Sequence, residues 1–443
     1  TWATIPLIKF LPNNILLAGR LFSVISGFGA LVGVFVLLWY LFGKKAAYWG
    51  SFFYLLTPYF LFYDRMALVD SAVNAAFIWM FFFSILLART LRLDVALIYG
   101  LVSGMSLLAK SSTQMYLGMS ALSPILFLQK NQKAFIKKLL NFSFLYVIVL
   151  VLAFAIYNVQ RLSPFLSFVA QKNKTFVMTF GEFLQTPFLA FFGNIRIIPK
   201  YVIWESAFVL PLLGVSGLAF LFKRDKKLFS YFLLWVILPF LAIAFFAKVI
   251  FPRYLIFFAS IFVFGASYLF SQLKNKKILF LFTFFFLLSA VYFDYTILFK
   301  HDRIPFPPVD RSQYIEGVAS GWGIREIAEY AREQVKEKQK SVIIIAEGNF
   351  GMAGDVLDSS LRADDKISIR GYWPLNKNDL DANKKDRDKN YILVVFSHRT
   401  DFPTNLPIKF IKKIDKPGGQ SSFYLFELWH EPYPLPLFLY NEQ

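Results

Sequence analysis

The chain has 443 residues, of which 57% are hydrophobic and 19% aromatic, including 55 phenylalanines. A soluble core of this size could not bury so much apolar surface, so the composition favours a membrane protein. The formal net charge is +19, but Lys and Arg lie in short clusters between apolar runs, which argues against a nucleic-acid partner. There are no cysteines, so disulfides and thiolate metal sites are excluded.

Apolar runs of about 17 to 25 residues, the length that crosses about 30 Å of hydrocarbon, recur through the first part of the chain. They predict about ten transmembrane helices, at roughly residues 15–41, 46–63, 71–89, 94–109, 112–128, 139–157, 205–222, 228–247, 254–271 and 278–298. The remainder is charged and rich in turn residues. We therefore predict a transmembrane domain over residues 1–299 and a soluble α/β domain over residues 300–443.

Basic clusters occupy alternate connections between these predicted spans. They contain Lys44 and Lys45; Arg89 and Arg92; Lys130, Lys133, Lys137 and Lys138; Lys223, Arg224, Lys226 and Lys227; and Lys274, Lys276 and Lys277. The positive-inside rule makes these loops cytoplasmic. The other connections, both chain ends and the C-terminal domain are then extracytoplasmic, in a protein of the plasma membrane. The long outer connection, roughly residues 158–204, suits short amphipathic helices at the membrane interface, or an ordinary long loop.

The C-terminal domain is predicted to be a small α/β sandwich. An amphipathic helix is expected over roughly residues 324–337, and short β-rich runs follow at roughly residues 342–346, 367–369, 391–396, 410–414 and 423–428. Glu347, Asp355 and His398 could be imagined as a second site. They are scattered along the chain, so we interpret them as solvated or capping residues.

Charges at the outer ends of the spans need an explanation, because a charge near hydrocarbon costs several kcal/mol unless it snorkels, pairs or faces water. The outer turn after the second predicted span carries Asp64, Arg65 and Asp70. Capping and interfacial anchoring would explain these charges without a binding site. The alternative is that two carboxylates and a guanidinium face a substrate.

Three further places on the same face carry charge. Lys110 lies at a tight outer turn, Arg253 and Tyr254 follow Pro252 at another span entrance, and Arg20 lies just inside the first span. Snorkelling would account for the lysine, and an interfacial anchor would account for the arginines and the tyrosine. Because all of these charges converge on one face, we predict a common site.

Such a cluster suits a lipid phosphate or diphosphate that carries a polar head. Cations would stabilise the negative charge that develops on a departing phosphate. A carboxylate would orient or deprotonate the attacking hydroxyl. The predicted chemistry is therefore glycosyl transfer from a membrane carrier.

Residues 6–71 contain PLIKFLP and then AGRLFSVISGFGALVGVFVLLWYLFGKKAAYWGSFFYLLTPYFLFYDRMALVDS. An arginine, a Gly-rich span, a basic Phe-Gly turn, a proline and Arg-x-x-x-x-Asp occur in this order, and GLVSGMSLLAKSS and FPRYLIFF follow. This pattern resembles the GT-C glycosyltransferases of the dolichyl-phosphate-mannose protein mannosyltransferase superfamily, including the bacterial lipid A aminoarabinose transferases. Topology and motif order agree over roughly the first 300 residues.

The resemblance implies an enzyme that moves a hexose or pentose from a polyprenyl-phosphate carrier to an acceptor hydroxyl on the outer face, with inversion. By motif, Asp70 is the outer-loop carboxylate and the catalytic candidate. The other candidates are expected to bind the donor: Arg65, Lys110, Arg253, Tyr254, Asp64 and Arg20. The acceptor, whether a glycan, a lipid or a protein, is not specified by these motifs.

The family's first span and the acidic residue after it, usually taken as the catalytic base, would precede Thr1, so we expect the chain to be truncated. The base is then not identified by this sequence. A lipid-linked glycan ligase or polymerase would also need outer-face arginines and carboxylates. A lipid-glycan transporter would show charged or broken helices in mid-membrane and inverted repeats, neither of which we find.

A membrane-anchored receptor is a further alternative, but ten spans exceed what anchoring requires. The three histidines, His301, His398 and His430, all lie outside the expected site. We therefore predict no metal ligands and no required cofactor, and leave dependence on a divalent cation open.

Overall fold

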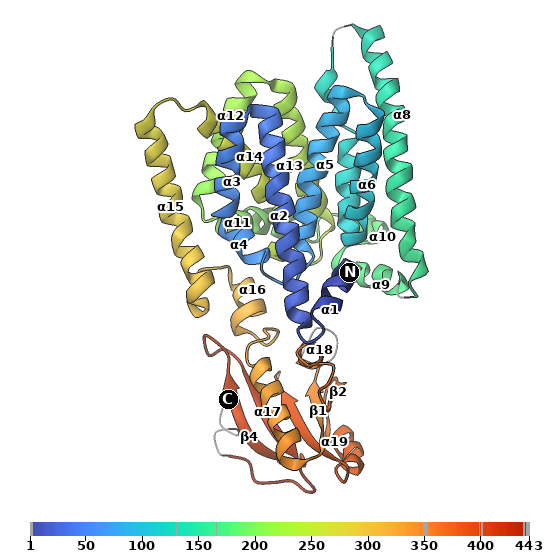
Figure 1. Ribbon diagram of the computed structural model, residues 1–443, viewed down its shortest axis with the longest axis vertical. Coiled ribbons are helices and arrows are strands. Elements are labelled where there is room, and N and C mark those ends of the chain that lie inside the picture. The colour runs from blue at the N-terminus through green and yellow to red at the C-terminus, as the bar shows by residue number, and fades with distance from the viewer. Residues whose placement is uncertain are drawn as a thin grey trace. The chain divides into compact units, whose positions relative to one another are not determined.

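A computed structural model describes residues 3–129, 131–164, 166–348, 353–397, 399, 402–436 and 439. The chain forms two compact units. We call them the membrane unit (Thr1–Ala3 and Arg20–Leu298) and the C-terminal unit (Thr4–Gly19 and Phe299–Gln443). Figure 1 shows that the first is a bundle of helices and the second contains a sheet with helices against it. Lys130 and His398, which carried predictions, lie outside the described residues.

Six helices in the described part of the chain are long and apolar enough to cross a bilayer. They are α2 (Ile15–Phe42), α5 (Asp70–Thr90), α8 (Gln132–Tyr157, continued by η3, Asn158–Leu162), α13 (Lys226–Phe246), α14 (Ile256–Gln272, preceded by η4, Pro252–Leu255) and α15 (Lys276–Phe299). Each coincides with one of the ten predicted apolar runs. The predicted fold class, a polytopic helical membrane protein with a C-terminal α/β domain, is confirmed.

The remaining four predicted runs are also helical, but they are shorter or broken. They correspond to α3 (Lys44–Leu55) with α4 (Pro58–Tyr63); α6 (Leu93–Ala109); η1 (Ser111–Thr113), α7 (Gln114–Ser120) and η2 (Ser123–Phe127); and α12 (Val209–Arg224). Counting the bent pair of α12 and α11 (Phe191–Glu205) as one span gives seven candidate spans among the described residues, fewer than the ten expected. Hydropathy cannot detect such breaks, whereas Pro58 and Pro124 mark the starts of two short helices, as expected of a residue without a backbone N–H.

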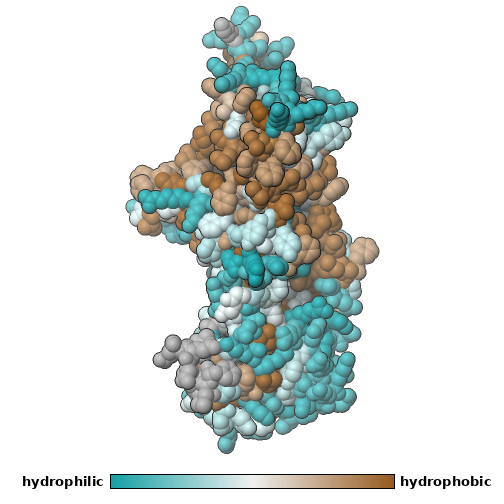
Figure 2. All heavy atoms as spheres, turned by 90° about the vertical axis from the view of Figure 1, so that its left-hand side faces the viewer, coloured by the Kyte–Doolittle hydropathy of each residue, from teal (hydrophilic) through white to brown (hydrophobic). Residues whose placement is uncertain are grey.

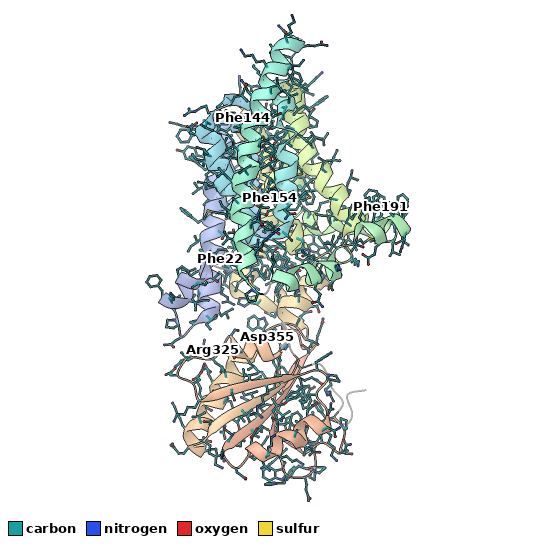
Figure 3. The ribbon with its side chains drawn as sticks, turned by 90° about the vertical axis from the view of Figure 1, so that its right-hand side faces the viewer. Phe22, Phe144, Phe154, Phe191, Arg325 and Asp355 are labelled. Atoms are coloured by element: carbon teal, nitrogen blue, oxygen red, sulfur yellow. The ribbon has the colours of Figure 1, made fainter. Side chains whose placement is uncertain are left out.

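Small residues bring the helices of the bundle close together. A Cβ on Gly217 of α12 would overlap the carbonyl of Gly265 on α14, and Gly104 of α6 similarly faces Ile156 of α8. Close backbone approach of this kind is typical of helix pairs in lipid. Apolar side chains also face outward, such as Phe144 on α8, which is labelled in Figure 3, and Figure 2 shows a largely apolar face over the helices of the membrane unit.

The segment between α8 and α12 consists of short helices, as predicted: η3, α9 (Leu166–Phe176), α10 (Phe180–Gln185) and α11. The bend between α11 and α12 measures 106°. The break falls at the start of the predicted span 205–222, and the view that no helix is broken in mid-membrane stays a prediction. The position of these helices at the membrane interface stays a prediction.

The C-terminal unit is built on a five-stranded mixed sheet in the order β2-β1-β3-β5-β4. Strands β1, β2 and β3 are parallel, and β5 is antiparallel to both β3 and β4. The strands are β1 (Ser341–Glu347), β2 (Ile367–Tyr372), β3 (Asn390–Phe396), β4 (Ile408–Asp415) and β5 (Ser422–Leu428). The helices and short turns are α1 (Thr4–Phe10), η5 (His301–Arg303), α16 (Pro308–Arg311), η6 (Ser312–Glu316), α17 (Ile324–Lys338), α18 (Ala353–Asp358), α19 (Lys377–Asn383) and η7 (Lys384–Asp386).

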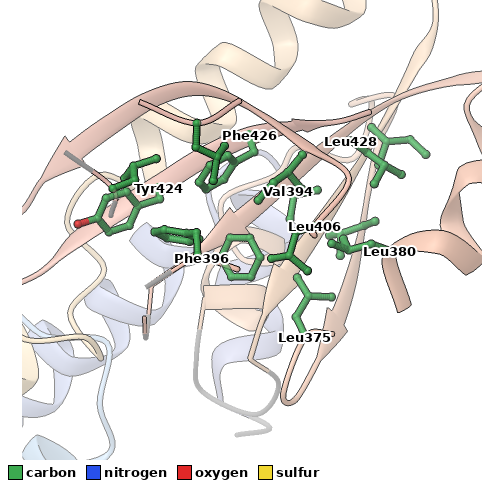
Figure 4. Close-up of a cluster of buried hydrophobic side chains, with 14 of the residues drawn as sticks. Leu375, Leu380, Val394, Phe396, Leu406, Tyr424, Phe426 and Leu428 are labelled. Carbon is green, nitrogen blue, oxygen red and sulfur yellow. The ribbon is translucent and has the colours of Figure 1, made fainter. Parts of the chain in front are cut away.

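Both faces of the sheet are buried, which explains the near-continuous apolar runs of β1 and β3. One face packs against α17 and α18 through Ile327 and Leu357. The other packs against α19 and the loops after β3, through Leu380, Phe396 and Phe426, as Figure 4 shows. The predicted amphipathic helix and all five predicted β-rich runs are therefore confirmed.

Candidate functional site

Asp70, the first residue of α5, forms an ion pair with Lys110, which directly follows α6. Asp70 is 3% exposed, and its Oδ1 accepts a hydrogen bond from the ammonium of Lys110 at 2.7 Å. Lys110 is the C-cap of α6, where the chain turns into η1. Thr113 fixes that turn, because its Oγ1 donates to the carbonyls of Ser106 and Lys110. The packing of α5 against α6 thus brings together two charges that are forty residues apart.

Two side chains of η4 extend this pair. The ammonium of Lys110 lies 4.2 Å from the ring centroid of Tyr254, and the guanidinium of Arg253 lies 5.2 Å from the same centroid. Two cations near one aromatic ring gain from its quadrupole, while their mutual repulsion favours a nearby anion. We call Asp70, Lys110, Arg253 and Tyr254 the cation cluster.

Hydrogen bonds between buried polar groups fix the relative positions of the helices that carry the cation cluster. Asn74, one turn after Asp70 on α5, accepts a hydrogen bond from Ser260 of α14 at 2.7 Å, and both residues are buried. The hydroxyl of Tyr59 on α4 donates to the carbonyl of Pro252, directly before Arg253. A buried polar pair specifies one relative position of two helices, because a shift would leave both groups unsatisfied.

The loop between α4 and α5, residues 64–69, begins with a carboxylate in an apolar setting. Asp64 Oδ2 accepts from the hydroxyl of Tyr54 at 2.9 Å, whereas its Oδ1 is buried without a partner among the described residues. Burial raises the pKa of Asp64 from 3.8 to about 6, opposed in part by hydrogen bonds with Ser71 and Tyr54. Gly27 of α2 lies against this carboxylate, so a Cβ there would overlap it.

The same loop carries Arg65, one of the three arginines predicted to bind the donor. Arg65 Nη1 lies 3.5 Å from the carbonyl of Ile297 on α15. Its pKa is lowered by burial and by the positive charge of Arg20 on α2. Ser23 secures the end of the loop, accepting from the N–H of Leu68 at 3.3 Å and donating to its carbonyl at 2.7 Å. Asp64, Arg65 and Arg20 therefore belong to a second charged group against α2, α3 and α15, distinct in its contacts from the cation cluster.

Sequence reasoning did not single out a carboxylate on α15. Asp294 lies within a candidate span and is 8% exposed, and its Oδ1 has no partner among the described residues. It is one turn before Ile297, whose carbonyl faces Arg65. An ionisable residue inside an apolar run was the available signal, because such residues are rare and costly in spans.

Of the three residues imagined as a second site in the C-terminal unit, Glu347 and Asp355 lie in different surroundings, and His398 is outside the described residues. Glu347 ends β1, is 2% exposed, and accepts two hydrogen bonds from Arg399. It is a buried, paired residue rather than a solvated or capping one, which corrects the sequence interpretation. Asp355 is exposed in the first turn of α18. Among the described residues, no three His, Asp or Glu side chains are grouped closely enough to hold a metal ion.

No protein-family description and no curated protein matches the chain. The fold does match solved structures. ArnT from Cupriavidus metallidurans, solved with undecaprenyl phosphate bound, is similar with a TM-score of 0.61 and 13% identity, over 100% of this chain and 88% of that one. The apo state of ArnT gives a TM-score of 0.58, with the same identity and coverage.

An oligosaccharyltransferase from Archaeoglobus fulgidus, solved with zinc and sulfate, has a TM-score of 0.48 and 13% identity, over 86% of this chain and 56% of that one. The likeness to ArnT covers the whole chain, including both units. The chain therefore has the fold of ArnT, and this likeness agrees with the resemblance that its sequence motifs predicted.

Proposed function

We propose that this protein is a membrane glycosyltransferase that moves a sugar from a polyprenyl-phosphate carrier to an acceptor hydroxyl on the outer face of the membrane, with inversion. The observation that carries the proposal is the cation cluster, in which Lys110 and Arg253 lie 4.2 and 5.2 Å from the centroid of one tyrosine ring and Lys110 is hydrogen-bonded to a buried carboxylate. Support comes from the fold, which is shared with ArnT, a protein solved with undecaprenyl phosphate bound.

In this proposal the cations of the cluster bind the donor phosphate. Arg253 offers a planar guanidinium suited to two oxygens of one phosphate, and Lys110 adds a point charge. Both side chains are partly exposed, so a ligand can reach them. Asp70 orients Lys110 through their hydrogen bond, and the ring of Tyr254 contacts both cations. Arg65 and Arg20 add positive charge from the neighbouring group.

The transfer breaks the bond between the anomeric carbon and the phosphate oxygen, and the electron pair leaves with the phosphate. The acceptor oxygen forms the new bond on the opposite face of the sugar, which inverts the anomeric configuration. Negative charge grows on the phosphate during this step, so fixed cations stabilise the transition state more than the ground state. A carboxylate takes the acceptor proton. Asp70, being paired with Lys110, positions the phosphate site, and the proton acceptor is a separate group.

The test is donor turnover by the purified protein. Radiolabelled polyprenyl-phosphate hexoses and pentoses are incubated with the protein and an extract of membrane acceptors, and release of polyprenyl phosphate is measured together with sugar incorporation. Arg253→Ala and Lys110→Ala should each lower turnover by roughly 100-fold, as expected for loss of one charge-stabilising donor. Arg92→Ala, which removes an exposed arginine before α6, is the matched control and should turn over donor like the wild type.

Two results would contradict the proposal. One is turnover of a suitable donor that is unchanged in both cation-cluster variants. The other is the absence of turnover with every lipid-phosphate sugar, combined with turnover of a lipid-diphosphate oligosaccharide, which would favour the ligase alternative.

A further inference from the structure

An apolar groove runs between three helices of the membrane unit, away from the cation cluster. It has a volume of about 530 Å³, within the range of small-ligand pockets. Leu212, Ser216 and Phe220 line it from α12, Leu273 from the end of α14, and Ile278 and Phe285 from α15. Leu212 and Phe220 are 69% and 52% exposed. The lining is thus apolar surface that the protein itself leaves uncovered.

The groove exists because α15 packs loosely. Its outward side chains are widely exposed, including Phe280 at 72% and Leu288 at 63%. In Figure 1, α15 leans away from α12 and α14, and Figure 2 views the apolar surface on this side of the molecule. From Leu212 to Phe220 the α12 wall extends about 12 Å, close to the depth of one leaflet of a hydrocarbon core about 30 Å thick.

Lysines gather at one end of this groove. Lys276 and Lys277 begin α15 and line a second hollow that shares Ile278 with the groove. Lys223, at the end of α12, lies 6.0 Å from the ring of the groove residue Phe220. In the part of the chain that the structure describes, none of these three lysines forms an ion pair. The nearby carboxylate, Asp225, caps α13 through the N–H of Leu228.

The end of the groove that carries the lysines is far from the proposed binding site of the donor phosphate. Arg65 contacts α15 at Ile297, and Lys276 is twenty-one residues away on the same helix, which corresponds to about 32 Å. A donor with its phosphate near the arginines would bring only its apolar tail toward the lysines. Uncompensated cations beside an apolar groove complement a lipid of the opposite leaflet, with an anionic headgroup at Lys223, Lys276 and Lys277 and an acyl chain along α12.

We propose that the groove between α12, α14 and α15 is a binding site for an anionic phospholipid that fastens α15 to the bundle. The phosphate lies among the three lysines, and one acyl chain covers Leu212 and Phe220. This site is separate from the donor site. Its occupancy is independent of the proposed transfer reaction.

The experiment measures lipid retention by the purified full-length protein. Protein exchanged into defined detergent micelles is titrated with phosphatidylglycerol, phosphatidylcholine or undecaprenyl phosphate, and bound lipid is counted by native mass spectrometry. The wild type should retain one phosphatidylglycerol at least tenfold more tightly than phosphatidylcholine. Undecaprenyl phosphate should not displace it.

Two variants distinguish the contribution of the lipid headgroup to binding from that of the acyl chain. Combined Lys223→Gln, Lys276→Gln and Lys277→Gln substitutions should remove the preference for phosphatidylglycerol. Ser216→Phe, which fills the groove from an exposed position, should lower retention of both phospholipids. The control combines Lys133→Gln, Lys137→Gln and Lys138→Gln, which removes the same charge from the exposed start of α8 and should leave retention unchanged.

The proposal is overturned if phosphatidylcholine is retained as tightly as phosphatidylglycerol, or if the groove-lysine variant keeps the preference. Displacement of phosphatidylglycerol by undecaprenyl phosphate, with the displacement lost in Ser216→Phe, would instead assign the groove to the carrier lipid.

Discussion

The two units differ in how their buried charged groups are hydrogen-bonded. In the C-terminal unit, several charges are matched: the buried Glu347 accepts from Arg399 and from the N–H of Leu375, and the half-buried Arg332 binds Asp365 through two nitrogens. Arg387 is an exception, because its Nη1 is buried without a hydrogen-bond partner among the described residues. In the membrane unit, Asp64 and Asp294 each keep a buried oxygen without a partner among the described residues. Asp70, which is paired with Lys110, is the exception that lies in the candidate site.

Lys416 is the clearest example in the C-terminal unit. It is 2% exposed, and its ammonium donates to the carbonyls of Gly317, Val318 and Ser320 at 2.9 to 3.1 Å. Burial lowers the pKa of Lys416 to about 8, so the ammonium remains charged at neutral pH. It ties the β4–β5 hairpin to the segment that precedes α17. Here a buried charge organises a loop and serves stability.

Whether a buried polar group is paired indicates its role. A buried charge whose hydrogen-bonding capacity is used up within the protein contributes to structure. A buried polar atom without a partner costs free energy, and its retention needs another reason, such as a ligand or a change of protonation. By this criterion Asp64 and Asp294 of the membrane unit are candidates for a functional role, whereas the paired Glu347 and Lys416 of the C-terminal unit serve structure.

The largest expected effect follows from breaking the ion pair between the buried Asp70 and the half-buried Lys110. Lys110→Met leaves Asp70 buried without its cation, which should cost about 3 kcal/mol of unfolding free energy and lower donor turnover by roughly 100-fold. Adding Asp70→Asn should restore stability, because no charge is then left unpaired, but should not restore turnover. Thermal unfolding in detergent and the donor assay measure the two properties separately.

The informative control for this pair is an exposed one. Arg92→Met together with Asp94→Asn removes a surface ion pair at the start of α6 and should change neither property measurably. If the double variant at positions 110 and 70 regained turnover, the pair would be structural only.

A smaller effect is expected from Lys416→Met. Removing the ammonium leaves three carbonyls without their donor, which should destabilise the C-terminal unit by about 2 kcal/mol. Lys412→Met, on β4 four residues before Lys416 and in a surface ion pair with Glu326, should have little effect. Hydrogen exchange of residues 317–320 should accelerate in the first variant alone; equal protection in both would show that Lys416 does not hold this segment.

The smallest effect, with opposite sign, is expected for Asp64→Asn. The folded-state pKa of Asp64, about 6, lies above the ordinary 3.8, a difference that corresponds to about 3 kcal/mol. Between these two pH values the folded state binds more protons than the unfolded state, so wild-type stability falls as pH rises from about 4 to 6. Above pH 6 the carboxylate is charged in both states, so the full difference of about 3 kcal/mol destabilises the folded state.

The amide is also buried, which offsets part of the gain, so we expect Asp64→Asn to stabilise the protein by about 1 kcal/mol at pH 7 and by nothing at pH 4. Unfolding midpoints at the two pH values test this. Asp94→Asn, at an exposed position, should show no such difference, and a constant effect of Asp64→Asn at both pH values would contradict an elevated pKa.

The sequence predicted the elements of the C-terminal unit well, because apolar runs between Gly, Pro and charged residues are a local signal. It did not predict the strand order, in which β1 lies between β2 and β3. In the membrane unit it located apolar segments but not their breaks, such as the one between Leu55 and Pro58. Hydropathy reports composition, whereas a break depends on backbone geometry.

For the site, the sequence predicted one charged face but not its internal pairing. The hydrogen bond between Lys110 and Asp70 and the approach of Lys110 to Tyr254 join segments that are 40 and 144 residues apart. Such contacts depend on how α5, α6 and η4 pack. Asp294 was missed because the run around it was treated as uniformly apolar, although one carboxylate in a span was visible.

The central claim is that the cation cluster binds a lipid phosphate. The most direct test compares equilibrium binding of undecaprenyl phosphate with that of undecaprenol, which has the same chain and no phosphate, to the purified protein and to Arg253→Ala. We expect the wild type to bind the phosphate at least tenfold more tightly than the alcohol, and Arg253→Ala to lose most of this preference while its binding of undecaprenol is unchanged. Equal binding of the two lipids by the wild type, or an undiminished preference in Arg253→Ala, would contradict it.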